Sequence, residues 1–281
     1  MTDNDLQLKG VQRIQLAMLK EFIRICEKYH LRYFLLGGSA LGAVRHSGFV
    51  PWDDDIDVGM PRADYEKFLA VAQAELGENH FLQTYATDKN YPMNFAKIRN
   101  SATAFIQQNV AHINMNHGIF IDIFPLDGVP GQKASQKICS SIVKVFVCAI
   151  LKKLNIKIYG SWTTFKSVTG WVIIVLLSIL IPLEVLRRVV DAFVKINKYD
   201  DCSMIVNWYG AYGLKEIIPK SYLDEGRSVL FENVSVAIPK NHDVYLRHLY
   251  GDYMTPPSVE NRASHHCVDI VDIENSYLVY R

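Results

Sequence analysis

Apolar side chains recur at steps of three and four over the first thirty positions of the chain. This is the spacing of one face of an α-helix, so we expect an amphipathic helix that packs on the back of a β-sheet. A second helix is expected to open at Met60-Pro61 and to end at Gly77, because proline suits the first helical position and glycine the end. The apolar positions of the two helices are Val11, Ile14, Met18, Phe22, Ile25 and Tyr29, then Tyr65, Phe68, Leu69, Ala72 and Leu76.

Short apolar runs bounded by turn residues predict the strands. They fall at residues 33–36, 81–85, 93–99, 103–107 and 118–125, and two short strands are expected within 229–239. Residues 242–250 predict a helix that Gly251 stops.

The middle of the chain is strongly apolar. Residues 138–151 predict a helix, and residues 162–183 contain an uncharged stretch that is marginal for the ~20 residues of a membrane-spanning helix. Three interpretations stay open: an in-plane membrane anchor, a pair of buried core or dimer helices, or a transmembrane hairpin. Cationic residues rim this hydrophobic hairpin, namely Lys152, Lys153, Lys157, Lys166, Arg187 and Arg188.

Composition limits the function classes. The chain has 281 residues, 49% of them hydrophobic, and a formal net charge of +1. A charge near zero gives no bulk attraction to nucleic acid, so we expect no nucleic-acid partner and a local site for any anion. The five cysteines show no metal-ligand spacing, which fits reduced thiols in a cytosolic setting. The polar start, Met1 to Lys9, lacks the apolar core of a signal peptide, so we expect a cytoplasmic active site.

Four carboxylates fall within five positions after Trp52. If Trp52 to Val58 is a strand, its alternation puts Asp53, Asp55 and Asp57 on one face and leaves Asp54 pointing the other way. Three carboxylates on one face repel one another unless a cation lies there, and Mg²⁺ prefers such oxygen ligands. The alternative is a solvated acidic loop. A Gly37-Gly38-Ser39 turn precedes the run, and its backbone N–H groups can bind phosphate oxygens, which favours the metal site.

A single carboxylate, Asp122, interrupts the apolar run at 118–125 and therefore needs a cation or hydrogen-bond donors. The alternative is an edge strand on which Asp122 faces water. Asp127, in Leu126-Asp127-Gly128, is interpreted as a turn residue. Lys97 and Arg99 alternate along one predicted strand, so they share a face, either toward a ligand or simply exposed.

These residues predict phosphoryl chemistry. Asp55, Asp57 and Asp122 form the carboxylate set that holds one or two Mg²⁺ or Mn²⁺ ions in phosphoryl transfer, with Asp53 as an auxiliary ligand; Asp122 could instead act as general base. Substrate and phosphate binding is assigned to Gly37, Gly38, Ser39, Arg45, Lys97, Arg99, His265 and His266. The aromatic loop from Trp208 to Gly213 faces a ring or sugar, or packs in the core.

The two motifs at residues 37–45 and 51–58 resemble the signature of the LicD family, within the nucleotidyltransferase-fold superfamily of the DNA polymerase β type. Asp122 and the segments 250–253 and 265–266 also resemble that family. The resemblance implies an α/β (α+β) fold: a small mixed sheet flanked by helices, with an inserted hydrophobic helical hairpin. It implies a nucleotidyltransferase-like core at 1–131, the helical insertion at 132–200, and a part at 201–281 that completes the catalytic domain.

The resemblance also implies an activity. Phosphocholine would pass from CDP-choline to a sugar hydroxyl of a teichoic-acid or lipopolysaccharide precursor, and CMP would be released. The related fukutin-like proteins use a CDP-alditol, so the head group stays open. Transfer of a nucleotide to a glycan or protein is a second enzyme hypothesis, and a membrane-anchored metal-binding scaffold is the non-enzyme one. A lipid-linked glycan acceptor would place the protein in the cytoplasm, peripheral on the inner face of the plasma membrane.

Overall fold

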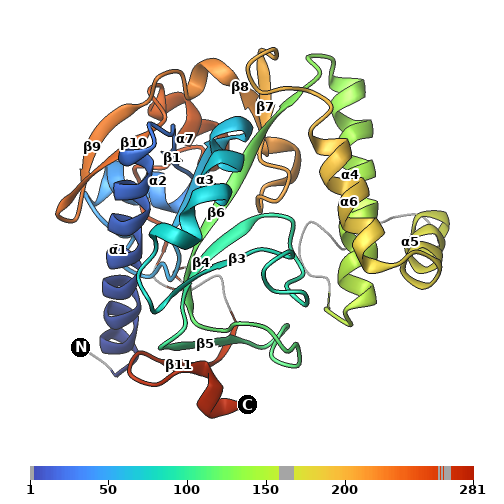
Figure 1. Cartoon of the computed structure of the whole chain (residues 1–281). Coiled ribbons are helices and arrows are strands. Elements are labelled where there is room, and N and C mark those ends of the chain that lie inside the picture. The colour runs from blue at the N-terminus through green and yellow to red at the C-terminus, as the bar shows by residue number, and fades with distance from the viewer. Residues whose placement is uncertain (1–2, 158–167, 259, 261, 263–266) are drawn as a thin grey trace.

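A mixed β-sheet runs through the centre of the molecule and helices flank it, as Figure 1 shows. The computed structural model describes residues 3–157, 168–258, 260, 262 and 267–281. The sheet order is β1-β2-β6-β4-β3, and β7 and β8 extend it along the second half of β6. β2 and β6 are parallel, and the other pairs are antiparallel. The strands are β1 (Phe34–Leu35), β2 (Asp57–Pro61), β3 (His80–Gln83), β4 (Ala96–Asn100), β6 (Ile119–Val129), β7 (Met204–Val206) and β8 (Ile217–Pro219).

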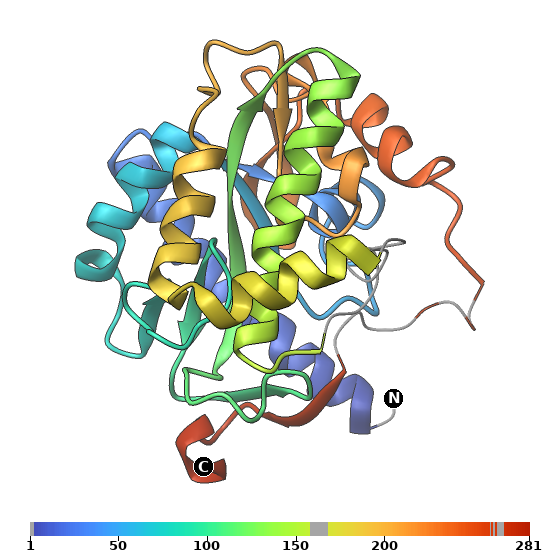
Figure 2. The same ribbon diagram turned by 90° about the vertical axis from the view of Figure 1, so that its right-hand side faces the viewer.

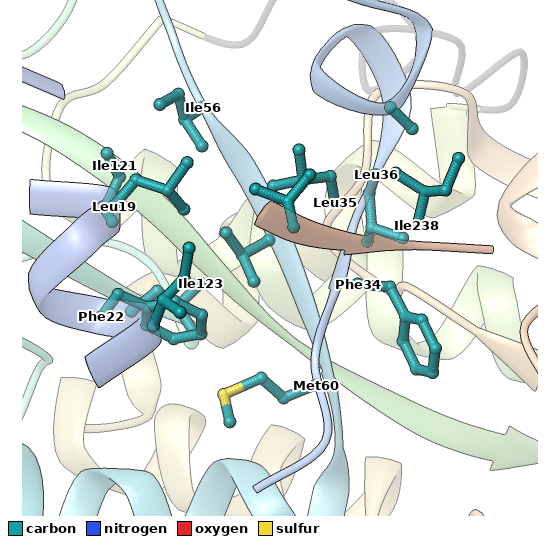
Figure 3. Packing of buried hydrophobic residues seen from close by; sticks show 14 of the residues in the cluster. Leu19, Phe22, Phe34, Leu35, Leu36, Ile56, Met60, Ile121, Ile123 and Ile238 are labelled. Atoms are coloured by element: carbon teal, nitrogen blue, oxygen red, sulfur yellow. The ribbon is translucent and has the colours of Figure 1, made fainter. Parts of the chain in front are cut away.

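The predicted first helix is confirmed as α1 (Asp3–Lys28). Its apolar face packs against the sheet, and Figure 3 shows Leu19 and Phe22 beside Ile121 and Ile123 of β6. Full burial of one such aliphatic or aromatic side chain stabilises the fold by ~1.5–3 kcal/mol. Tyr29 lies beyond the helix and is exposed; its hydroxyl donates to Glu75 Oε1.

The second predicted helix is α3 (Arg62–Glu75), and its start differs from the prediction. Met60 and Pro61 are the last residues of β2, and Pro61 caps the helix instead of opening it. These two residues belong to the sheet because Met60 and Pro61 pair with Pro125 and Leu126 of β6.

Asp127 is not a turn residue as predicted. It lies in β6, which continues to Val129, and is fully buried. Both of its carboxylate oxygens accept hydrogen bonds of 2.7 Å from the Arg62 guanidinium. A buried carboxylate requires such a partner, and this one comes from α3, 65 positions earlier. The pair anchors the start of α3 to the sheet.

Within the described ranges 133–157 and 168–194, three helices cover the other side of the sheet, where a two-helix hairpin was expected. They are α4 (Lys133–Lys153), α5 (Val168–Leu180) and α6 (Leu183–Val194). Figure 2 shows α5 lying across α4 as the outermost of the three. Arg187 is not part of a cationic rim, because it is fully buried and donates to the carbonyl oxygens of Lys89 and Tyr91. Lys166 lies outside the described residues.

The last third of the chain adds β7 and β8 to the sheet and contributes to two separate strand pairs. The predicted strand pair is confirmed as β9 (Arg227–Phe231) and β10 (Val234–Ile238), and the predicted helix as α7 (His242–Tyr250), which Gly251 ends with a φ of +72°. β11 (Val268–Asp272) pairs with β5 (Ala104–Gln107). Besides the core between α1 and the sheet, buried apolar residues form a second hydrophobic core. It contains side chains from each of the predicted parts 1–131, 132–200 and 201–281, for example Phe95, Val147 and Val206.

Candidate active site

A cavity of about 930 Å³ opens at the edge of the sheet where β2 begins. Among the described residues six carboxylates line it, and four of them gather at the start of β2 and on β6: Asp53, Asp55, Asp57 and Asp122. Asp57 is the first residue of β2 and pairs in register with Asp122 on β6. Because paired residues of adjacent strands point to the same face, the sheet itself sets these two carboxylates side by side. Asp122 is buried at a central strand, so the alternative of a solvent-facing edge position is wrong.

Of the predicted strand from Trp52 to Val58, only Asp57 and Val58 lie in a strand, at the start of β2. Asp53 and Asp54 are outside any strand, because side chains of α1 take their carbonyl oxygens: Gln12 donates to Asp53 O at 2.9 Å and Gln15 to Asp54 O at 2.7 Å. Asp53 and Asp55 nonetheless reach the same cavity as Asp57. Asp54 is buried and does not line it.

The Gly37-Gly38-Ser39 segment is the first turn of α2 (Gly37–Arg45), where a turn and loop were expected. Gly37 has a φ of +49°, which favours glycine. A Cβ on Gly38 would lie 2.5 Å from Asp53 Oδ2, so glycine lets this carboxylate lie against the start of the helix. That end carries partial positive charge. The helix start therefore contributes to holding Asp53 in the site.

Ser39 ties α2 to the strand that carries Asp57. Its Oγ accepts a hydrogen bond from the Asp57 backbone N–H at 2.8 Å, and Ser39 is buried outside the cavity lining. The structure thus gives Ser39 a positioning contact, and its assignment to phosphate binding stays a prediction. Gly37 and Gly38 do line the cavity.

Lys97 and Arg99, which alternate along β4, both face the cavity and are buried. The Lys97 ammonium lies 2.5 Å from Asp122 Oδ1 and 3.4 Å from the centroid of the Phe120 ring. Arg99 donates from Nε to Gln83 Oε1 and from Nη1 to the Gly118 carbonyl. Burial lowers the pKa of the Lys97 ammonium and that of Arg99, the latter to about 10. Neither residue is the exposed strand charge that formed the alternative interpretation.

Burial raises the pKa of the Asp57 carboxyl well above its ordinary value. The negative charges of Asp55, Asp122 and Asp53 raise it further, while Lys97 acts in the opposite direction. The carboxylates outnumber the cation paired with them, and a hard divalent cation would relieve the repulsion. Oxygen atoms of Asp53, Asp54 and Asp55 also lie within 4.8 Å of one another, close enough to share one ion. The chemistry of the donor set therefore fits Mg²⁺, although the carboxylates that meet this spacing among the described residues are not the predicted set of Asp55, Asp57 and Asp122.

Arg45 lies in the last turn of α2 and lines the cavity. Its Nη1 donates to the Tyr253 carbonyl at 2.7 Å, and its guanidinium lies 6.0 Å from the Trp52 ring centroid. Arg262 lies over the same ring at 4.9 Å. Arg45 thus sits at a cationic rim beside Trp52. The predicted ligands His265 and His266 lie outside the described residues.

The loop after Trp208 brings Tyr209, Gly210 and Tyr212 to the cavity, as one interpretation of its sequence expected, and Trp208 and Tyr209 are buried in the second core, as the other expected. Glu216 and Tyr245 also line the cavity, and the sequence pattern singled out neither of them. The sequence does carry a signal for Tyr245, because a tyrosine on the buried face of a helix has a phenol that requires a hydrogen-bond partner. Nothing near Glu216 in sequence marks it.

Comparison with known proteins identifies relatives of this chain. Residues 30–139 match the family model described as LicD/FKTN/FKRP, nucleotidyltransferase domain. The chain is 31% identical to the lipopolysaccharide cholinephosphotransferase LicD of Haemophilus influenzae over 271 residues, which cover 93% of this chain and 96% of the relative. It is 29% identical over 93 residues to the ribitol 5-phosphate transferase FKRP of Homo sapiens, 33% of this chain and 18% of that protein. The matched region of the family model contains Asp53, Asp55, Asp57 and Asp122.

Proposed function

Because the chain belongs to the LicD family, we propose that it transfers phosphocholine from CDP-choline to a sugar hydroxyl of a teichoic-acid or lipopolysaccharide precursor. It is an enzyme of the phosphotransferase class, as its relatives are named. The observation that carries the proposal is the convergence of Asp53, Asp55, Asp57 and Asp122 on one cavity beside Lys97 and Arg99. We also propose that the sheet and its carboxylates form a polymerase β-type nucleotidyltransferase core.

The reaction exchanges one phosphorus–oxygen bond for another. The acceptor hydroxyl oxygen bonds to the phosphorus that carries choline, the bond from that phosphorus to the CMP oxygen breaks, and the hydroxyl proton leaves to a base. Asp53, Asp55, Asp57 and Asp122 would hold Mg²⁺ or Mn²⁺, one ion or two, which would neutralise the phosphate oxygens and align the attacking and leaving groups.

The geometry of the site suggests a role for each of its polar groups. Lys97 and Arg99 neutralise charge on the leaving CMP, since both are cations that face the cavity. Lys97 meanwhile fixes the Asp122 carboxylate through their 2.5 Å contact. Asp122 either completes the metal site or accepts the acceptor's proton.

The test incubates the purified chain with CDP-choline, Mg²⁺ and candidate glycan acceptors and measures CMP. We expect CMP release that requires both acceptor and metal and that EDTA stops. Absence of CMP above background with every acceptor, from folded protein, would refute the proposal. Labelled donors separate the alternatives: phosphate retained with choline on the acceptor supports this reaction, and cytidine on the acceptor supports nucleotide transfer instead.

We further propose that the protein attaches peripherally to the cytoplasmic face of an anionic membrane, where a lipid-linked acceptor resides. Exposed apolar side chains cluster on the outward side of α5, where Trp171, Leu176, Ile179 and Leu180 are each about half exposed or more. Figure 2 shows this helix on the outside of the molecule. An apolar helix face that lies in the plane of the bilayer matches this arrangement.

A cation borders the apolar face, which makes an anionic lipid surface its fitting occupant. The Lys152 ammonium lies 5.3 Å from the Trp171 ring centroid, and Lys157 and Arg188 are exposed. Among the described residues, α4 is long and apolar enough by length and composition to cross a membrane. Its face with Val147 and Cys148 is buried in the second core, so we assign α4 to the protein interior and not to a membrane span. The described length of α5 is 13 residues, short of the ~20 that span a bilayer.

Flotation with phosphatidylglycerol-containing vesicles tests the attachment. We expect the wild type to float and the double variant Ile179→Glu with Leu180→Glu to stay at the bottom of the gradient. Val279→Glu is the matched control, since Val279 is equally exposed in the C-terminal segment. Equal flotation of all three proteins, or none by the wild type, would contradict the attachment while leaving the transferase proposal intact.

A further inference from the structure

The cavity continues beyond the carboxylates into a pocket walled by tyrosines. Tyr245 and Tyr250 come from α7, and Tyr212 from the loop before the short 3-10 helix Gly213–Glu216. The rings of Tyr212 and Tyr250 meet edge to face with centroids 5.4 Å apart, and their hydroxyls lie 3.1 Å apart. The Tyr245 hydroxyl accepts the Gly37 N–H at 3.0 Å. We call Tyr212, Tyr245, Tyr250 and Glu216 the tyrosine subsite.

The tyrosine subsite adjoins the phosphoryl chemistry. A Cβ added at Gly37 would lie 3.5 Å from the Tyr250 hydroxyl and 3.4 Å from Asp57 Oδ2. Both groups therefore border the same glycine at the start of α2. Figure 1 shows α7 beside α2, in agreement with their contacts. A group linked to the reacting phosphorus through two carbons would reach from the carboxylates into this subsite.

Glu216 is the charged member of the subsite and has no role in the mechanism above. Its carboxylate lies directly over Gly210, where a Cβ would come within 2.2 Å of Oε1, and it accepts the Tyr212 backbone N–H at 3.1 Å. Within the described part of the chain, neither Lys nor Arg forms an ion pair with it. Burial raises the pKa of this carboxyl to about 7. A carboxylate so placed gains from any cation that enters the cavity.

The chemistry of the walls selects the kind of cation. A quaternary ammonium has no N–H to donate, carries a diffuse charge and is best held by aromatic rings with a nearby carboxylate. A Mg²⁺ ion would instead require several oxygen ligands in octahedral array, and the subsite offers one carboxylate among phenol rings. A neutral alditol chain would require a row of paired donors and acceptors, and would leave Glu216 uncompensated.

We propose that Glu216, together with the rings of Tyr212, Tyr245 and Tyr250, binds the trimethylammonium of the donor's choline and makes the enzyme prefer a cationic head group. The inference rests on the proposed function, because it takes the choline-bearing donor from that proposal. It assigns four specificity residues, all of which follow residue 139 and so lie beyond the segment that the family model matches.

The test compares the binding of CDP-choline with that of CMP, which lacks the head group, by calorimetry in Mg²⁺. Glu216→Gln should weaken CDP-choline binding about 10-fold or more, the loss expected for a desolvated cation contact. CMP binding should change less than about 2-fold, because CMP does not reach the subsite. Glu225→Gln is the matched control, as it removes the same charge from an exposed position outside the cavity.

A second pair of variants separates the ring from its hydroxyl. Tyr250→Phe should keep CDP-choline affinity within about 3-fold, whereas Tyr250→Leu should lower it by about 5-fold or more, since only the leucine loses the aromatic face. This pair also decides the matter if Glu216→Gln fails to fold. Selectivity for CDP-choline over CDP-ribitol should fall in Glu216→Gln by the same factor as its affinity.

The outcomes separate the two proposals. A wild type that releases no CMP from CDP-choline refutes the proposed function. An active wild type whose Glu216→Gln variant binds CDP-choline and CMP with equal losses, or with none, refutes the tyrosine subsite alone. Loss of Mg²⁺ affinity in the same variant would make Glu216 a metal ligand and would refute the subsite as well.

Discussion

Asp57→Asn should abolish turnover and at the same time leave the metal-free protein more stable than the wild type. Asp57 and Asp122 are paired residues of adjacent parallel strands. Strands lie ~4.8 Å apart, and two unit charges at that separation repel by about 3.5 kcal/mol at an effective dielectric constant of ~20. Lys97 offsets part of this through its contact with Asp122. We therefore expect the free energy of unfolding to rise by about 1–3 kcal/mol.

The raised pKa of Asp57 determines how the stability difference between the variant and the wild type changes with pH. The pKa of the Asp57 carboxyl is raised in the fold above its ordinary value of 3.8. The folded state thus binds this proton more tightly than the unfolded chain, so the wild type loses stability as the pH rises above 3.8. The stability advantage of the Asp57→Asn variant should be absent in more acid solution and should grow as the pH rises toward neutrality.

Thermal unfolding in EDTA and in Mg²⁺, with CMP release measured in parallel, checks the prediction. Each 1 kcal/mol corresponds to about 2–4 °C in Tm for a chain of this size. Mg²⁺ should raise the Tm of the wild type and have little effect on the variant. Asp201→Asn, an exposed carboxylate outside the cavity, is the control. Near wild-type turnover in Asp57→Asn, or a lower Tm in EDTA, would refute the reasoning.

Three further changes test other parts of the site. Gly38→Ala places a Cβ 2.5 Å from Asp53 Oδ2 and should weaken Mg²⁺ binding about 10-fold in a metal titration, whereas Gly131→Ala, with open space around it, should not. Lys97→Met strands a buried carboxylate and should lower the metal-free unfolding free energy by about 3 kcal/mol, partly restored by Mg²⁺; an unchanged value would show that the ion pair contributes nothing. Glu216 should contribute a loss of at most about 3 kcal/mol to wild-type stability between pH 4.5 and 7, because its pKa is raised to about 7 in the fold, and Glu216→Gln should lack that component; identical pH profiles would contradict it.

Local patterns were enough for the elements that carry their own signals. The three-and-four spacing of Val11, Met18, Phe22 and Ile25 predicted α1, because that spacing matches the helix period. Gly251 marked the end of α7, because its φ of +72° is costly for other residues. The Asp55 and Asp57 motif likewise predicted where the carboxylates gather, although not the strand boundary.

Long-range partners decided what the sequence pattern missed. Asp53 and Asp54 looked like strand residues, but Gln12 and Gln15 of α1 bind their carbonyl oxygens from about 40 positions away. Asp127 looked like a turn residue, because its partner Arg62 is even more remote, 65 positions earlier in the sequence. Such contacts exist only once the chain is folded, so no local window reveals them.

In the helical insertion, too, the sequence pattern did not distinguish a buried charged residue from an exposed one. Arg187 follows an apolar run and resembled a rim cation, yet it is buried because carbonyl oxygens of Lys89 and Tyr91 accept its donors. Buried cations are stable only with such partners, and the loop that supplies them lies about 100 positions earlier. Glu216 is the converse case, a half-buried carboxylate that no local pattern distinguishes from an exposed one.

The most direct test of the central claim follows both halves of the donor in one reaction. CDP-choline labelled separately in choline and in cytidine is incubated with a glycan precursor, Mg²⁺ and the wild-type chain, and the acceptor and the released nucleotide are then counted. The carboxylate site as described predicts choline label on the acceptor, cytidine label only in CMP, equal amounts of the two, and neither in EDTA or with Asp57→Asn. Cytidine label on the acceptor, or choline transfer that persists in EDTA, would contradict it.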